Sequence, residues 1–576
     1  MQYTGAELFT HALKSEQVKF LFAYPGGQVI DLFDALYSVP EIRLILPRHE
    51  QGAVFAADGY ARVTGQTGVC LATSGPGATN LVTGIANANA DSVPLVCFVG
   101  QVPTRLLGQS AFQEVSFTEM IRPVCKAAFA VRERTALAET IREAFRTATS
   151  GRPGPVVVEL PKDIQQAYGE ADYPVEPAVR VEPPCISEHQ LYAALERLNQ
   201  AQKPLFLIGG GIRIAQASQE MTLLAEKTGV PVVSTMMGKG ALPSSHPMYV
   251  GNLGVHGSYA ANTAVSQCDV LFAIGTRFSD RVMGAPEGFA KNASIVQIDI
   301  EPAPQLPEKI LTITADAKMA LNALLRIARP LQTGAWNQQI RQWKKMHPLA
   351  ATGSSLSPQH IFRALSKAFP EAIYCADVGQ NQLWASQFLP LDEKCQLLTS
   401  GGLGAMGYGL PSAIGAKLGC PERTVIAIAG DGGIQMSIQE LATAAVCELP
   451  IIICIFNNTC LGNVRQWQKM FYEQRYSGTC MRARVSCPPR CVTSGRYCPP
   501  YLPDFVKLAE SYGAAGIRVQ EEWEISSALS QAKHNIYKPT IIEFCIAPDQ
   551  AVLPIVPPGK ALDQMVLTTG NTYSHE

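Results

Sequence analysis

The sequence has 576 residues, of which 47% are apolar and 16% are charged, and its formal net charge is −1. This length allows several domains with cores of their own, and the balanced charge argues against a nucleic-acid or acidic-membrane partner. The N-terminus shows no signal-peptide pattern, and no apolar run approaches the roughly 20 residues that cross a bilayer. Most of the 16 cysteines stand singly in apolar segments, which is typical of buried thiols in a reducing compartment. We therefore expect a globular cytoplasmic protein.

Two changes in composition divide the sequence into three parts. Residues 167–188 are rich in Pro and Glu, and residues 329–357 mix polar helical patterns with small residues. In each part, strand-like apolar runs alternate with helical segments, which predicts three open, mostly parallel α/β sheets. The runs lie at residues 95–100, 156–160, 204–208, 270–275, 425–429 and 451–456. The predicted domains comprise residues 1–170, 188–330 and 357–550, followed by a C-terminal tail over residues 551–576.

In the first part, a carboxylate stands where a predicted strand at residues 43–46 meets an Ala-rich helix. Glu50 follows Arg48 and His49 there, and a lone Glu in such a place is most often a charge at a helix start. A buried Glu50 could instead share a proton with N1′ of an aminopyrimidine, the step that activates thiamine. The Gly-rich turns at 25–27 and 74–80 precede helices, where glycine serves as a cap or lets a ligand approach.

In the second part, three consecutive glycines follow the predicted strand at residues 204–208. Gly209, Gly210 and Gly211 precede a helix, and the unpaired N–H groups at a helix start can hold a phosphate. A triple glycine says little alone, so its interpretation depends on the rest of the chain.

The third part holds two polar turns, each at the end of an apolar run. Gly430-Asp431-Gly432 ends one run and Asn457-Asn458 ends the next, with a helix predicted over residues 435–447 between them. In such a β-α-β unit both turns lie at the carboxyl ends of parallel strands, where these sheets bind ligands.

The chemistry of these two turns suits a metal-bound diphosphate. Asp431 and Asn458 offer oxygen ligands for Mg²⁺, which proteins usually share with a phosphate group. Gly430 and Gly432 let the backbone approach that group closely. Two unrelated turns are the alternative, but strand, helix and spacing together resemble the thiamine diphosphate-binding motif.

Further matching segments extend over nearly the entire chain. They lie at residues 23–27, 48–53, 72–80, 100–103, 111–114, 151–155, 161–163, 275–281, 377–380, 400–407, 464–468 and 557–559. On these segments the sequence resembles the catalytic subunits of the acetohydroxyacid synthase (acetolactate synthase) family. The resemblance implies a pyrimidine-binding domain, a central FAD-type domain and a diphosphate-binding domain. It also implies a homodimer or a dimer of dimers, because in this family the glutamate and the diphosphate site come from different subunits.

The resemblance assigns catalytic roles to side chains that alone would be interpreted as core or surface residues. Met406 would hold thiamine in its bent conformer, and Gln113 beside Phe112 would point into the site. Lys162 would place a cation near the ketoacid substrate. In addition, Arg281 would bind the carboxylate of the second ketoacid, and Trp467 would form an apolar wall that favours 2-ketobutyrate.

The resemblance also implies three cofactors. Thiamine diphosphate would be held by Glu50 together with Gly379, Gln380, Asn381, Gly430, Gly432 and Gly433. Mg²⁺ would be bound by Asp431, Asn458 and Cys460. FAD, in a structural role, would contact Arg152, Gly209, Gly210, Gly211, Leu253, His256, Gly275, Arg277, Asp299, Asp316 and Gln382.

The sequence departs from the family pattern at four places. Ser279 stands where an acidic residue is usual, Asn381 replaces a common His, and Asn463 replaces a usual Met. Residues 479–501 form an insertion where many family members have a short mobile loop. These departures leave the acceptor preference and the local cofactor contacts open.

The reaction expected from the resemblance is the joining of pyruvate to pyruvate or 2-ketobutyrate with release of CO₂. The products would be 2-acetolactate and 2-aceto-2-hydroxybutyrate, in branched-chain amino acid synthesis, and a small regulatory subunit is an expected partner. Another thiamine enzyme is the first alternative, which the flavin positions, Lys162 and Arg281 oppose. The second is an inactive regulatory paralogue, which the presence of Glu50, Asp431 and Asn458 opposes.

The insertion carries four cysteines that the family does not explain. Cys480, Cys487, Cys491 and Cys498 lie in a polar segment that also holds several arginines. Three interpretations compete: a second metal ion or iron–sulfur cluster, a pair of disulfides, or unlinked surface thiols. We expect a four-cysteine metal site, or a redox-sensitive staple in its place, beside the entrance to the active site.

Overall fold

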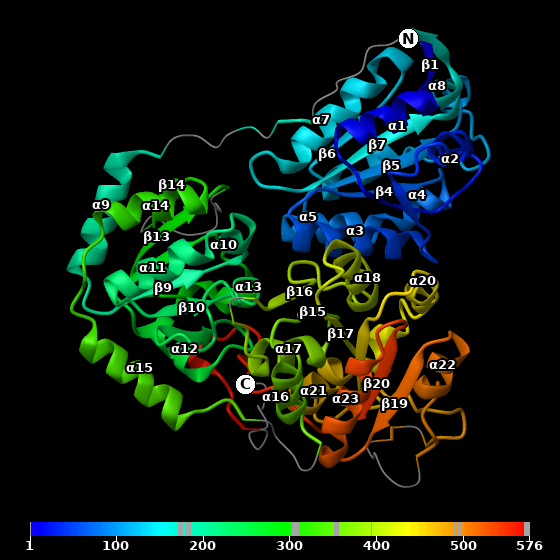
Figure 1. The fold of residues 1–576 in the computed structure, drawn as a ribbon. Coiled ribbons are helices and arrows are strands. Elements are labelled where there is room, and N and C mark those ends of the chain that lie inside the picture. The colour runs from blue at the N-terminus through cyan, green and yellow to red at the C-terminus, as the bar shows by residue number, and fades with distance from the viewer. Residues whose placement is uncertain are drawn as a thin grey trace.

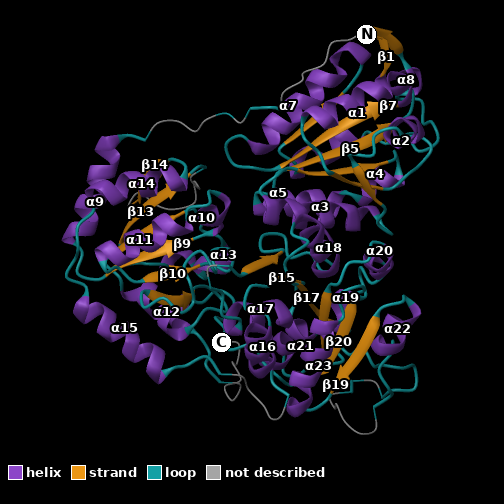
Figure 2. Ribbon diagram, in the orientation of Figure 1, coloured by secondary structure: helices purple, strands orange, loops and turns teal. Residues whose placement is uncertain are grey.

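The computed structural model describes residues 2–170, 177–179, 181, 186–301, 310–350, 356–392, 394–488, 490–491 and 498–568. These residues include three six-stranded sheets in which all neighbouring strands are parallel (Figures 1 and 2). Alternate residues of the strands enter hydrophobic clusters on opposite faces, because helices cover both sides of each sheet. The predicted fold class, three open and mostly parallel α/β sheets, is therefore confirmed.

The first sheet has the strand order β3-β2-β4-β5-β7-β6, beside a separate antiparallel pair, β1-β8. Its strands are β1 (Gln2–Thr4), β2 (Phe20–Ala23), β3 (Arg43–Ile45), β4 (Gly68–Ala72), β5 (Leu95–Gln101), β6 (Ala127–Ala130), β7 (Pro155–Pro161) and β8 (Tyr168–Glu170). The helices are α1 (Gly5–Ser15), α2 (Ile30–Tyr37), α3 (Glu50–Thr64), α4 (Pro76–Asn80), α5 (Val82–Asp91), α6 (Phe117–Ile121), α7 (Leu137–Thr149) and α8 (Lys162–Gln166).

The second sheet has the order β11-β10-β9-β12-β13-β14. Its strands are β9 (Pro204–Ile208), β10 (Val232–Ser234), β11 (Tyr249–Asn252), β12 (Val270–Ile274), β13 (Ser294–Asp299) and β14 (Ile310–Thr314). The helices are α9 (Glu188–Gln200), α10 (Gly210–Ile214), α11 (Ser218–Thr228), α12 (Tyr259–Gln267), α13 (Asp280–Met283), α14 (Ala317–Ile327) and α15 (Gly334–Met346).

The third sheet has the order β16-β15-β17-β18-β20-β19. Its strands are β15 (Ile373–Ala376), β16 (Gln396–Thr399), β17 (Val425–Gly430), β18 (Ile452–Asn457), β19 (Ala515–Val519) and β20 (Thr540–Cys545). The helices are α16 (Pro358–Ala368), α17 (Gln380–Phe388), α18 (Gly409–Gly419), α19 (Asp431–Ile434), α20 (Glu440–Val446), α21 (Gly462–Phe471), α22 (Phe505–Ser511) and α23 (Ile525–His534).

One predicted helix is shorter in the structure. Of the single helix expected over residues 435–447, only α20 (Glu440–Val446) forms, and residues 435–439 are turns that follow α19. Gln435 donates through Nε2 to the backbone oxygen of Asp431 at 2.8 Å. Such a bond from a side chain to the backbone competes with a continuous helix.

The first and third domains share one hydrophobic core. Helices α3 and α18 face each other between the two sheets (Figure 1). Their close approach depends on glycine, because a Cβ added at Gly415 would lie 1.7 Å from the backbone oxygen of Ala56. The helix that begins with Glu50 is thereby fixed against the third domain.

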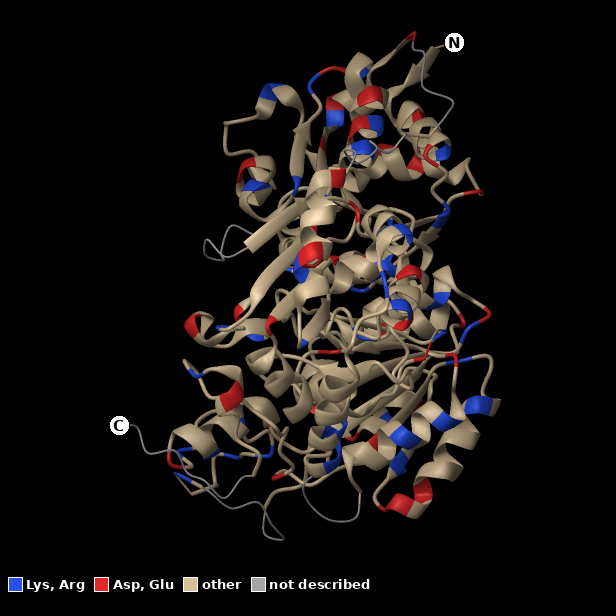
Figure 3. Ribbon diagram, turned by 90° about the vertical axis from the view of Figure 1, so that its left-hand side faces the viewer, with Lys and Arg blue, Asp and Glu red and all other residues tan. Residues whose placement is uncertain are grey.

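Outside the sheets, residues 551–568 run back across the molecule. Leu553, Ile555 and Val566 pack against Met470 and Phe471 of α21. Acidic and basic residues are interspersed along the ribbon in the view of Figure 3. Among the described residues, no helix combines the length and apolarity that a membrane crossing requires.

Candidate active site

The two polar turns of the third domain lie at adjacent strand ends. Asp431 follows β17, Asn458 follows β18, and these strands pair in parallel. Asp431 is buried, and its Oδ2 has no hydrogen-bond partner within the described part of the chain. Burial raises the pKa of this carboxyl to about 7. An unpartnered buried oxygen of this kind is suited to binding a cation.

Gln380 holds the second polar turn in place. Its Oε1 accepts a hydrogen bond from Asn458 Nδ2 at 3.0 Å, which leaves Asn458 Oδ1 directed to the backbone N–H of Cys460 at 3.2 Å. Burial and the nearby Asp431 raise the pKa of the Cys460 thiol to about 12. The thiol therefore stays protonated and is a poor metal ligand. The backbone oxygen of Cys460 is the better ligand for a metal ion.

Of the other residues predicted to hold the diphosphate, three serve the local backbone structure. Asn381 donates to the backbone oxygen of Asp377 at 2.6 Å. Gly379 and Gly433 fit tightly, because an added Cβ would lie 2.7 Å from Asn381 Oδ1 and Asp377 Oδ1 respectively. Gly430 and Gly432 leave the turn around Asp431 without side chains.

The loop that carries Met406 is held by a buried carboxylate. Asp377 accepts hydrogen bonds from the N–H groups of Gly407 and Gly409, both at 3.0 Å. Burial raises the pKa of Asp377 to about 6. The Met406 Cε atom lies 3.8 Å from the position of a Cβ on Gly432. Met406 is therefore beside the Asp431 turn.

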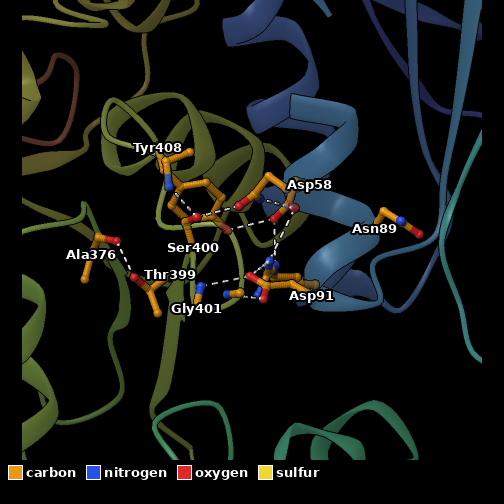
Figure 4. Close-up of polar contacts among 12 residues, drawn as sticks. Asp58, Asn89, Asp91, Ala376, Thr399, Ser400, Gly401 and Tyr408 are labelled. Carbon is orange, nitrogen blue, oxygen red and sulfur yellow. Dashed lines mark hydrogen bonds and ion pairs between the residues drawn. The ribbon is translucent and has the colours of Figure 1, made fainter. Parts of the chain in front are cut away.

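A buried polar network ties the same loop to the first domain (Figure 4). Arg62 of α3 binds Asp58 at 2.6 Å and Asp91 at 2.9 Å. Tyr408 donates to Asp58 at 2.7 Å, and Asp91 accepts from the N–H groups of Gly401 and Gly402. No sequence motif marks Asp58, Arg62, Asp91 or Tyr408, because the network joins segments far apart in the sequence.

In the first domain, Glu50 is the first residue of α3. It accepts a hydrogen bond from Asn80 at 2.9 Å and faces Gly77. Glu50 is partly buried in the single chain, not fully buried as expected for the catalytic group. Its described hydrogen bonds stay within the first domain.

Glu440 supports the turn before Glu50 from the third domain. Its buried carboxylate accepts the N–H of Arg48 at 2.9 Å, and a Cβ on Gly52 would lie only 2.4 Å from its Oε1. No sequence signal marks Glu440, because its partner Arg48 is distant in the chain and uses only its backbone.

The remaining first-domain candidates border the Gly-rich turns. Gln113 lies next to Gly75, with its Cβ 2.9 Å from the position of an added Cβ there, and it has φ of 63°. Lys162 donates to the backbone oxygen of Gly27 at 2.8 Å. The neighbouring Phe112 is exposed.

A cavity of about 1720 Å³ brings together most of the candidate flavin residues. Those that line it are Arg152, Gly210, Gly211, Leu253, His256, Gly275, Arg277, Asp299, Asp316 and Gln382. Gly209 lies outside the lining and packs against Gly275 instead, where an added Cβ would lie 2.1 Å from the Gly275 oxygen. Burial, with Arg281 nearby, lowers the pKa of His256 to about 4.

Arg281 and Trp467, from the second and third domains, meet at a smaller cavity. It has a volume of about 510 Å³ and is also lined by Asn463 and Arg475. The Arg281 side chain is 64% exposed, and the Trp467 indole N–H has no partner in the described chain. Arg281 is therefore accessible to an anionic ligand at this place.

The insertion gives no support to the expectation of a second metal site. No three His, Cys, Asp or Glu side chains within the described ranges are grouped to hold a metal ion. The four-cysteine site at Cys480, Cys487, Cys491 and Cys498 therefore stays a prediction. Arginines hold the segment together: Arg482 donates to the backbone oxygens of Pro499 and Cys498, and Arg484 donates to that of Pro500.

Both ends of the insertion contact the Asp431 turn. At one end, the Sδ atom of Met481 lies 3.3 Å from the position of a Cβ on Gly432. At the other, the Tyr501 hydroxyl interacts with the Asp431 carboxyl and accepts a hydrogen bond from Gln435 at 3.0 Å. Tyr501 carried no motif signal, since it belongs to the insertion.

Comparisons with known proteins agree with the three-domain fold. Models of the thiamine pyrophosphate enzymes match residues 3–120 (N-terminal TPP binding domain), 191–324 (central domain) and 377–544 (C-terminal TPP binding domain). The chain is 42% identical to the acetolactate synthase large subunit of Corynebacterium glutamicum, over 97% of this chain and 89% of that protein. It is 40% identical to the acetolactate synthase isozyme 3 large subunit of Escherichia coli, over 98% of both chains.

The three matched domains define the class: the chain is a thiamine pyrophosphate enzyme. Within that class it belongs to the family of acetolactate synthase large subunits, as its identity to relatives over nearly the whole chain shows. The predicted family and enzyme class are confirmed.

Proposed function

We propose that this chain is a catalytic subunit that joins pyruvate to a second 2-ketoacid, pyruvate or 2-ketobutyrate. One CO₂ is released, and the products are 2-acetolactate or 2-aceto-2-hydroxybutyrate, intermediates of branched-chain amino acid synthesis. The observation that carries the proposal is the placement of Asp431 and Asn458 at adjacent strand ends, with Asp431 Oδ2 buried and unpartnered.

The Asp431 turn would hold Mg²⁺ and the diphosphate of thiamine diphosphate. Asp431, the amide oxygen of Asn458 and the backbone oxygen of Cys460 are hard oxygen ligands, and phosphate and water oxygens would complete about six. Gly430 and Gly432 leave room for the diphosphate. When bound, thiamine diphosphate supplies the nucleophilic carbon for the reaction.

Glu50 would hold the proton at the pyrimidine ring of the cofactor. Its carboxylate is oriented by Asn80, and Glu440 fixes the turn that precedes it. The described hydrogen bonds of Glu50 stay within its own domain. A second copy of the chain would therefore bind the diphosphate of the cofactor whose pyrimidine ring Glu50 contacts. This supports a homodimer as the smallest active unit.

The substrates would lie between the first-domain loops and α21. Gln113 and Lys162 border the Gly-rich turns, and Met406, beside Gly432, would support the cofactor. Arg281 would bind the carboxylate of the acceptor ketoacid through its planar guanidinium. Trp467, in the same cavity wall, would contact the acceptor side chain.

FAD would occupy the large cavity between the domains. The lining supplies glycines at a helix start, Gly210 and Gly211, of which Gly211 donates its own N–H to the Gly275 oxygen, and cations at Arg152 and Arg277. These groups suit a diphosphate-bridged dinucleotide. The reaction has no net redox change, so FAD would have a structural role. The relatives are named large subunits, which supports a small regulatory subunit as a further partner.

Product analysis tests the proposal directly. The purified chain is supplied with pyruvate, 2-ketobutyrate, thiamine diphosphate and Mg²⁺, with and without FAD. We expect both acetohydroxyacids and one CO₂ for each product molecule. Acetaldehyde as the sole product would identify a simple decarboxylase and contradict the proposal, and unchanged activity and stability without FAD would contradict the flavin assignment.

A further inference from the structure

Cys480, at the start of the insertion, lies directly opposite Cys460 at the end of the Asn458 turn. The two residues form an isolated antiparallel bridge. On one side, Leu461 N–H donates to the Thr479 oxygen at 2.9 Å, and on the other, Met481 N–H donates to the Thr459 oxygen at 3.0 Å.

This pattern defines the spacing of the two cysteines. Because the flanking residues exchange the hydrogen bonds, Cys460 and Cys480 are a non-hydrogen-bonded pair, whose Cα atoms lie about 4.5 Å apart with the side chains on one face. Disulfides join Cα atoms about 4.4–6.8 Å apart. The backbone spacing therefore accommodates a disulfide, and neither cysteine is in one in this structure.

We propose that Cys460 and Cys480 form a reversible disulfide that fastens the insertion onto the cofactor-binding turn. Cys480 is exposed and Cys460 is buried, so the order of the steps follows from access. The Cys480 thiolate attacks a low-molecular-weight disulfide and releases one small thiol. The Cys460 thiol then gives up its proton to water as its sulfur attacks the Cys480 sulfur, and the second small thiol is released. The protein thiols lose two electrons and two protons, and the small disulfide is reduced to two thiols.

The link would close the segment over the diphosphate site. Leu461 and Met481 are the neighbours of the two cysteines. Their Cδ2 and Sδ atoms lie 2.7 Å and 3.3 Å, respectively, from the position of a Cβ added at Gly432. Fixing them together holds both side chains over the turn, so oxidation is expected to slow the exchange of thiamine diphosphate. This consequence rests on the proposed function of that turn, whereas disulfide formation does not.

Cys487 provides a matched control within the same insertion. Its Sγ accepts a hydrogen bond from the N–H of Arg484 at 3.3 Å, in a turn of its own. Unlike Cys480, it has no bridge to Cys460. Cys487→Ser should leave the disulfide intact, and Cys480→Ser should abolish it.

The test uses the full chain with oxidised glutathione as the oxidant, followed by peptide mapping without reduction. We expect a linked peptide pair containing Cys460 and Cys480 in the parent and in Cys487→Ser, reversed by dithiothreitol. Absence of this pair, or a link to Cys487 instead, would overturn the proposal.

The functional consequence is measured as thiamine diphosphate release after removal of Mg²⁺ with a chelator. We expect release from the oxidised parent to be several-fold slower than from the reduced parent, with no such difference in Cys480→Ser. Equal release rates in the linked and reduced parent would contradict the proposal that the disulfide closes the insertion over the diphosphate site. If the reduced chain binds no thiamine diphosphate, the proposed function is contradicted. The peptide map still shows in that case whether Cys460 and Cys480 form a disulfide.

Discussion

At Asp377 and Asp431 the third domain buries a carboxyl group that has no cation beside it. The two differ in their partners: Asp377 accepts two backbone N–H groups, whereas Oδ2 of Asp431 has no partner in the described chain. Backbone N–H groups compensate for the loss of water around Asp377. Oδ2 of Asp431 lacks this compensation, so this oxygen is the one available to a bound cation.

Glu50→Gln should retain the fold but lose most of the proton exchange at C2 of bound thiamine diphosphate. An amide cannot share a proton with the pyrimidine nitrogen, and losing one acid–base group typically costs about 10²–10⁴ in rate. Exchange is followed by NMR in deuterated buffer, with exposed Glu119→Gln as the control. Exchange at the parental rate in Glu50→Gln would refute this role of Glu50.

Tyr501→Phe should weaken Mg²⁺ binding while preserving the packing of the ring against Phe505. The lost hydroxyl interacts with Asp431 and accepts from Gln435, and one hydrogen bond contributes about 0.5–1.5 kcal/mol, or roughly two- to tenfold in affinity. Mg²⁺-dependent quenching of intrinsic fluorescence measures the affinity, with exposed Tyr537→Phe as the control. The same affinity in both variants would show that Tyr501 does not position Asp431.

Arg281→Lys should impair the joining step more than decarboxylation. A lysine keeps the charge but loses the two-pronged contact with a carboxylate. The measurement is acetolactate formed for each CO₂ released, which we expect to fall. A ratio equal to that of the parent would show that Arg281 does not bind the acceptor.

At the scale of elements, local sequence patterns predict the strands. They do not predict contacts between residues that are distant in the chain. The predicted run at residues 204–208 coincides with β9, because a buried parallel strand is apolar along its whole length. The helix predicted over 435–447 forms only from Glu440 to Val446, and before it the Gln435 side chain bonds back to Asp431. The contact between Glu440 and Arg48 joins residues 392 positions apart. No local signal predicts such a contact.

Arg62→Met should destabilise the contact between α3 and the loop that carries Met406. It would leave the buried carboxylates of Asp58 and Asp91 without their cation, which typically costs about 3–5 kcal/mol. Asp91 also holds the N–H groups at the start of this loop, so affinity for thiamine diphosphate should fall as well.

Urea unfolding and cofactor titration measure the two effects of Arg62→Met. The control is Arg146→Met, which removes the more exposed ion pair with Glu143 and should cost no more than about 1 kcal/mol. Equal losses of stability in the two variants would show that the buried network contributes no more than a surface pair.

At the scale of the whole molecule, one buried lysine joins the second and third domains. Lys239 follows β10 and donates to the backbone oxygen of Ser386 in α17. Burial lowers the pKa of Lys239 to about 7, against roughly 10.4 in an unfolded chain. Between these values the unfolded chain binds a proton that the folded chain does not, so the free energy of unfolding rises with pH across this window.

Lys239→Met should therefore stabilise the chain most near pH 7, and the gain should shrink toward pH 10. The pKa difference corresponds to a gain of up to about 4 kcal/mol in the free energy of unfolding. Loss of the hydrogen bond to Ser386 reduces this gain by about 1 kcal/mol. Urea unfolding at pH 7 and pH 9.5 measures the change, with exposed Lys345→Met as the control. Because the parent gains stability with rising pH while the variant does not, their difference must depend on pH. A constant difference would show that the Lys239 ammonium is not desolvated between the two domains.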